Sequence, residues 1–171
     1  MDSPPMRLLA PALALLLSSC AAQSAPSAAV PSACQSIRSA VLARDSSALN
    51  VLDVLCRGDL VVIAGALPPD YTLAVAAVHI ARTTPGVSHV ETYFVPRSAR
   101  EATDSALAAQ LKRAVAGTDG VAATSTDLTV IAGTVVLVGV VDDQAKADRL
   151  VASLGAVSGV KGVKAFLQVK P

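Results

Sequence analysis

The sequence predicts an α+β protein made of two tandem copies of one unit, each a three-stranded mixed sheet with two helices packed on one face. The first observation is the stretch Leu128–Val141, LTVIAGTVVLVGVV, which is β-branched and interrupted by glycines, as hairpin strands are. The second is a weaker copy of the same pattern at Asp59–Pro96. A sheet with one apolar face must be covered, so we expect each copy to fold as helix–strand–strand–helix–strand.

The second copy shows the pattern more clearly. Leu107, Leu111 and Val115 recur on one face of a helix that begins near Ala102, and polar residues, among them Asp104, Lys112 and Arg113, are assigned to its other faces. Strands are expected at Thr124–Ile131 and Thr134–Val141. A second helix follows with one apolar face, and a last strand is expected at Val160–Val169. The face of that second helix consists of Ala147, Leu150, Val151 and Leu154.

The first copy begins with a helix whose apolar face holds Cys34, Ile37 and Val41. Strands are expected at Leu49–Cys56, Leu60–Ala66 and Val87–Val95. Arg57–Asp59 forms the hairpin turn, one residue longer than the turn of the second copy. Pro68 and Pro69 are expected to end the middle strand and to start a helix with Leu73, Ala77 and Ile80 on its apolar face.

Five glycines are assigned to the backbone rather than to a ligand, since no phosphate-loop motif contains them. Gly133 is expected in a hairpin turn, and Gly65 at the end of a strand. The remaining three mark a strand bend or the entry to a last strand: Gly86, Gly139 and Gly159.

Two aromatic residues occupy matched places on the last strands, Tyr93 in the first copy and Phe166 in the second. Alternation puts Val163, Ala165, Leu167 and Val169 toward the helices, so Phe166 points to the opposite face of its sheet. Each ring either covers its own sheet or meets an inter-domain or partner interface.

The N-terminus predicts export. Arg7 precedes the apolar run Leu8–Leu17, which is too short for a permanent membrane span. Leu17-Ser18-Ser19-Cys20 resembles a bacterial lipobox, in which Cys20 is acylated and becomes the first residue. The alternative is an ordinary secretory signal with a chance cysteine. We therefore expect a signal peptide at 1–19, from Met1 or Met6, and a flexible Ala/Ser/Pro tether at 20–33.

Sorting and redox expectations follow from export. Ala21 follows the cysteine and no aspartate marks inner-membrane retention, which predicts an outer-membrane lipoprotein facing the periplasm. In an oxidising compartment the remaining Cys34 and Cys56 are expected to form a disulfide between a helix start and a strand end. Two separate buried thiols are the alternative.

Composition and spacing argue against other classes of protein. A net charge of +1 gives no basis for nucleic-acid binding. The histidines have neither triad spacing nor ligand spacing to a cysteine, so no metal, cofactor or catalytic residue is expected. Asp142 and Asp143 are assigned to helix capping. The sequence thus predicts a protein that is not an enzyme.

The order of these motifs resembles the BON domain of bacterial envelope proteins. The resemblance rests on Gly139, Gly159-Val160, Val163, Leu167 and Val169 in the second copy, and on Gly65, Gly86-Val87 and Val90 in the first. It implies BON domains at 34–97 and 102–170. With the lipobox, the chain is similar to dual-BON outer-membrane lipoproteins linked to division and envelope stress.

The resemblance also implies a function: binding of anionic phospholipid by the helix Ala102–Gly117, with Lys112 and Arg113 on the head group and Leu107 and Leu111 as apolar contacts. A solvated helix face is the simpler interpretation of the basic pair. The alternative function is a protein-interaction or chaperone-like adaptor for envelope proteins, with Tyr93 and Phe166 as its surface and the lipid only as a tether.

Overall fold

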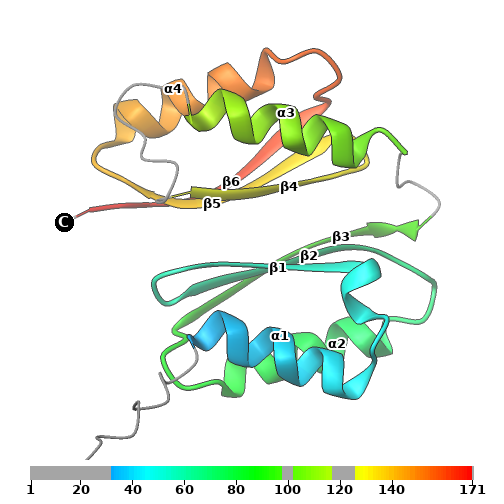
Figure 1. Cartoon of the computed structure of the whole chain (residues 1–171). Coiled ribbons are helices and arrows are strands. Elements are labelled where there is room, and N and C mark those ends of the chain that lie inside the picture. The colour runs from blue at the N-terminus through cyan, green and yellow to red at the C-terminus, as the bar shows by residue number, and fades with distance from the viewer. Residues whose placement is uncertain (1–31, 98–101, 117–125, 171) are drawn as a thin grey trace, which may run out of the picture. The chain divides into compact units, whose positions relative to one another are not determined.

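The structure, a computed structural model, describes residues 32–97, 102–116 and 126–170. Two halves have the same order of elements (Figure 1). The first half comprises α1 (Ala33–Arg44), β1 (Leu52–Arg57), β2 (Leu60–Leu67), α2 (Thr72–Thr83) and β3 (His89–Pro96). The second half comprises α3 (Asp104–Ala116), β4 (Thr126–Ile131), β5 (Thr134–Val141), α4 (Gln144–Gly155) and β6 (Gly162–Val169).

Each half contains a three-stranded mixed sheet, which confirms the predicted α+β class. The strand orders are β1-β2-β3 and β4-β5-β6. In both sheets the first pair is antiparallel and the second is parallel. The two helices of each half cover one face of its sheet (Figure 1).

The cores under the helices are built from small and medium apolar side chains. Ile37 and Val41 of α1 and Leu111 of α3 are fully buried, as the helical spacing predicts. In α2, Ala77 is buried as predicted, and Leu73 and Ile80 are partly buried and pack against the core. The fully buried residues of α2 are Ala74, Ala77 and Ala81, which match Ala147, Leu150 and Leu154 of α4 in spacing.

Local hydrogen bonds to Asp45 and Asp70 mark two boundaries of the first half that differ from the predicted ones. The carboxylate of Asp45 accepts hydrogen bonds from Ser47 N and Oγ, and a 3-10 turn, η1 (Ala48–Asn50), occupies the start of the expected strand. The prolines do not start α2. The carboxylate of Asp70 accepts from Thr72 N at 2.9 Å, and the helix begins there.

The two hairpin turns have the same length, so the extra residue predicted in the first turn was wrong. Arg57 pairs with Leu60, and Ile131 pairs with Thr134. Two residues remain in each turn: Gly58-Asp59 in the first half and Ala132-Gly133 in the second.

Gly65 lies inside β2 rather than at its end, because the strand continues to Leu67. A Cβ at this position would clash with the carbonyl oxygen of Val51. Gly139 holds the matched place in β5, opposite Thr126 as Gly65 is opposite Leu52. At Gly65, therefore, the close approach of backbone requires glycine.

The faces of the two sheets that lack helices share one apolar cluster. Leu55, Leu60, Val62, Ala64 and Ala66 come from the first sheet, and Ile131, Val136 and Val138 from the second. Tyr93 and Phe166 pack against this cluster at matched register positions. The residues that determine this contact therefore come from both halves.

Candidate functional site

Helix α3, expected to bind lipid, contributes to both the core and the surface. Leu107 is 8% exposed and Leu111 is 0% exposed, and both belong to the core of the second half. Their expected role as apolar lipid contacts was wrong, because the same spacing that makes a helical face turns that face toward the sheet. Lys112 and Arg113 are exposed.

Asp104 fixes the start of α3. Its side chain is buried, and its carboxylate accepts hydrogen bonds from Ala132 N at 2.8 Å and Gly133 N at 2.9 Å. Asp104 was predicted on a face other than the apolar one, and this role was not foreseen. Its spacing from Leu107 and Leu111, three and seven residues, was the signal that places it on the buried face. The carboxylate ties α3 to the hairpin turn.

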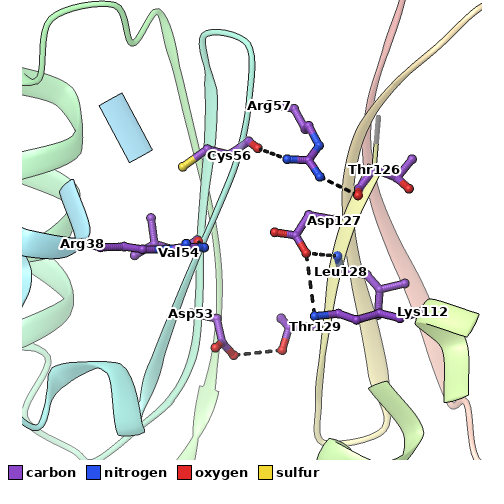
Figure 2. Close-up of polar contacts among 10 residues, drawn as sticks. All are labelled: Arg38, Asp53, Val54, Cys56, Arg57, Lys112, Thr126, Asp127, Leu128 and Thr129. Atoms are coloured by element: carbon purple, nitrogen blue, oxygen red, sulfur yellow. Dashed lines mark hydrogen bonds and ion pairs between the residues drawn. The ribbon is translucent and has the colours of Figure 1, made fainter. Parts of the chain in front are cut away.

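The exposed Lys112 lies beside a hollow of about 290 Å³. The hollow is lined by Lys112 and Val115 of α3, by Arg57 at the end of β1, and by Thr126, Asp127 and Leu128 of β4. Lys112 Nζ lies 3.9 Å from Asp127 Oδ1, and Asp127 Oδ1 also accepts from Leu128 N at 2.9 Å (Figure 2). A half-exposed pair at this distance holds the ammonium group only weakly.

Arg57 is a functional candidate that the sequence analysis treated as a turn residue. Its Nη2 donates to the carbonyl oxygen of Thr126 at 2.6 Å, and its Nη1 donates to that of Cys56 at 3.0 Å (Figure 2). Its Nε is buried and has no hydrogen-bond partner among the described residues. The guanidinium group thus connects the two halves at the wall of the hollow.

Two further polar contacts join the halves. Thr129 Oγ1 donates to Asp53 Oδ2 at 2.9 Å (Figure 2). Gln168 Nε2 donates to Asp59 Oδ1 at 3.4 Å. Hydrogen bonds from Ser88, and then from Gln168, lower the pKa of Asp59. These contacts add to the bond from Arg57 in holding the two halves together.

The lining of the hollow carries a net positive charge. Two cations and one carboxylate line it, and arginine and lysine donors suit phosphate or carboxylate oxygens. Its lining contains no pair of nucleophile and base. Among the residues that the structure describes, no group of three or more His, Cys, Asp or Glu side chains is placed to hold a metal ion.

The other predicted residues lie elsewhere. Tyr93 and Phe166 are half-buried against the cluster between the sheets. Cys34 and Cys56 form the predicted disulfide, with 5.8 Å between their Cα atoms. Gly86, Gly133 and Gly159 adopt positive φ. Cys20 lies outside the described residues. No helix in 32–97, 102–116 or 126–170 has the length and apolar character needed to cross a bilayer.

Comparison with known proteins identifies the second half. Residues 103–171 match the BON domain family, so the chain contains a BON domain there. No curated protein matches the chain. It is similar to two solved structures of CdsD, a structural protein of the type III secretion system of Chlamydia trachomatis. The first, of the C-terminal domain, is 18% identical with a TM-score of 0.35, and 78% of this chain is covered. The second is 19% identical with a TM-score of 0.31 and the same coverage of this chain. The chain spans 64% and 61% of those two chains.

Proposed function

We propose that the protein is a non-enzymatic, lipid-anchored envelope module that binds anionic phospholipid through α3 and the adjoining hollow. In this proposal both halves are BON-like domains, the chain faces the periplasm from the outer membrane, and phospholipid binding supports envelope integrity under stress. The resemblance to the BON domain family motivates the ligand class. The structure supplies the surface on which the proposal depends.

The observation that carries the proposal is the charge of α3. The one carboxylate of the helix, Asp104, is buried and hydrogen-bonded, so the exposed face presents only small residues, Gln110 and the two cations Lys112 and Arg113. By contrast α4 exposes Asp148 beside Arg149. Basic residues near an anionic membrane each contribute about 1 kcal/mol of attraction. A head-group phosphate at the end of α3 would meet Lys112 together with Arg57.

Flotation with phospholipid vesicles tests the proposal. The chain from Ala21, without a lipid, is mixed with vesicles of phosphatidylcholine alone or with one third phosphatidylglycerol. We expect it to float only with the anionic vesicles and to be released by salt, because exposed charges are screened. Lys112→Glu with Arg113→Glu should weaken binding at least tenfold.

The matched control is Arg149→Glu with Lys164→Glu, which makes the same change in net charge on α4 and β6. It should retain most of the binding. Equal binding to neutral and anionic vesicles, or equal loss in both double variants, would contradict a site on α3.

The lipid anchor is tested separately. Cys20→Ala should move the chain from the membrane fraction to the soluble periplasmic fraction. If Cys20→Ala stays in the membrane fraction, the chain is held there by something other than the predicted acyl group.

The adaptor function predicted as the alternative needs a different surface. Tyr93 and Phe166 pack within the chain's own contact between sheets. Substituting them would therefore disturb the contact between the sheets before it affected the binding of a partner.

A further inference from the structure

Helix α2 carries an apolar ridge on the surface of the first half. Tyr71, just before the helix, is 51% exposed and Val75 is 67% exposed. His79, one further turn along, is also exposed. Spacing by four residues puts the three side chains on one side of the helix. Large apolar groups left in water at successive turns indicate a contact surface.

The second half shows that the fold does not need this ridge. The buried residues Ala74, Ala77 and Ala81 match Ala147, Leu150 and Leu154, and the same alignment matches Tyr71 to Gln144 and Val75 to Asp148. In α4, Gln144 Nε2 donates to Asp148 Oδ1 at 2.9 Å, so the matched face is polar. The apolar ridge is therefore a feature of the first half alone.

A groove runs beside the ridge, between α2 and β3. It is a hollow of about 510 Å³ whose walls include Val75, Val78 and Arg82 of α2 and Thr92 and Phe94 of β3. Phe94 and Val78 also pack against the core, so the floor of the groove is apolar and fixed. Arg82 and His79 line it, and no carboxylate does. The groove thus offers an apolar floor with a cation at its wall.

The strand on one side of the groove has a free edge. In the order β1-β2-β3, the residues His89–Pro96 pair with β2, and no other strand within the described ranges pairs with them. A strand of eight residues at the edge of a sheet presents unpaired N–H and C=O groups that can accept an added strand. When such a strand is added, alternate side chains of the added segment point toward the helix side.

We propose that the groove between α2 and β3 binds an extended segment of another protein. The segment pairs with the edge of β3 as a fourth strand. It places an apolar side chain on Val78 and Phe94, and a carboxylate beside Arg82. The occupant is a peptide rather than a membrane, because backbone groups at a strand edge are satisfied by another strand, and a flat lipid surface does not fill a hollow between helix and strand. This site is separate from the lipid site on α3.

The test selects peptides on the full chain, purified in mild detergent with its disulfide intact. A display library of random ten-residue peptides is panned against the wild type, and enriched peptides are synthesised with a fluorescent label. Anisotropy should show that they bind the wild type at least tenfold more tightly than Val75→Asp. Tyr71→Gln should weaken binding in the same direction. Both substitutions install the matched residue of the second half, so the fold tolerates them.

The matched control is Leu42→Asp, which makes the same charge change at an exposed apolar residue of α1. It should bind the peptides within twofold of the wild type. Hydrogen exchange should slow at the amides of β3 when a peptide is added, and N-methylation at alternate residues of the peptide should abolish binding.

Three results would overturn the proposal. Panning could enrich no peptide, or the enriched peptides could bind wild type and Val75→Asp equally. Vesicles containing phosphatidylglycerol could protect residues 71–79 from exchange while no peptide binds, which would make the face a membrane contact. Vesicle flotation of the α3 double variant tests only the lipid site, and peptide binding tests only the groove. Either proposal can therefore be refuted without the other.

Discussion

The two halves tie their first helix to their hairpin by different bonds at the same place. Cys34 stands three residues before Ile37, as Asp104 stands three residues before Leu107, and both are in the first turn of their helix. In the first half a disulfide joins Cys34 to Cys56 near the end of β1. In the second half the carboxylate of Asp104 accepts from the amides of the turn, at Ala132 and Gly133.

The difference separates two ways of stabilising one architecture. A disulfide acts mainly by restricting the unfolded chain, and it depends on the redox state of the compartment. A buried carboxylate acts in the folded state, by satisfying amide groups that would otherwise be buried without partners. Identical topology therefore does not imply identical sensitivity to reducing agent.

The largest effect is expected from the disulfide. It closes a loop with a sequence separation of 22 residues, for which the entropic model gives about 3 kcal/mol. Cys34→Ala with Cys56→Ala, or reduction of the wild type, should lower the free energy of urea unfolding by about that amount. Hydrogen exchange should accelerate first in α1 and β1.

The control is dithiothreitol added to the double variant, which should have no further effect. If exchange accelerates equally in α3 and β4, the disulfide stabilises the whole chain rather than its own half, and the comparison between halves fails.

Asp104→Ala should give the next largest loss, about 2 kcal/mol, since it leaves one buried and one partly buried amide without an acceptor. Asp104→Asn retains one carbonyl oxygen and should cost less. The measurement is urea unfolding with exchange at Ala132 and Gly133. A substitution that leaves these amides as protected as in the wild type would show that the carboxylate is not their essential partner.

The two hairpin turns allow a pair of substitutions that are expected to change the stability of the protein in opposite directions. Gly58 and Ala132 occupy the first turn position with φ of +56° and +55°. A left-handed conformation costs a residue with Cβ roughly 1 kcal/mol. Gly58→Ala should therefore destabilise the first half by about 1 kcal/mol, while Ala132→Gly should be neutral or stabilising. Thermal unfolding of the two single variants measures both signs, and stabilisation by Gly58→Ala would refute the argument.

The sequence was sufficient for the repeat, its element order and the disulfide, because all three follow from periodicity and from two cysteines at opposite ends of paired elements. The sequence was not sufficient to predict the residues of the candidate site on α3. Leu107 and Leu111 were predicted both to form the apolar face of the helix and to contact lipid. The same side chains cannot be buried against the sheet and exposed to a membrane. Asp104 was misplaced because it was assigned to another face of the helix, although its spacing puts it on the apolar face.

Contacts between the halves were the least predictable part. Arg57 and Thr126 are far apart in the chain and meet only because the two sheets pack face to face. No local pattern marks an arginine at a strand end as a donor to another half. The ridge of α2 escaped notice for a related reason. The predicted face rested on Leu73, Ala77 and Ile80, and Tyr71 and Val75 were not compared with the polar residues of α4.

The smallest effect is expected from acid, at a network of ion pairs that, among the described residues, only the second half carries. Asp142 follows β5 where Pro68 follows β2, and it accepts from Lys146 Nζ at 2.5 Å and Lys170 Nζ at 2.7 Å. These bonds, that of Lys146 first, lower the pKa of Asp142 from 3.8 to about 2. Because the folded pKa lies below the unfolded one, the contribution is present above about pH 4 and is lost as the pH falls toward 2.

The measurement is the stability difference between wild type and Asp142→Asn, by thermal unfolding at pH 6 and at pH 2. The difference should be small at pH 6, since the group is exposed and its ion pairs are screened, and it should shrink further at pH 2. A difference that stays constant between the two pH values would mean that the carboxylate charge contributes nothing. The ends of β5 and β6 would then be held by their strand pairing and by the backbone bond from Lys170 N to Val141 O.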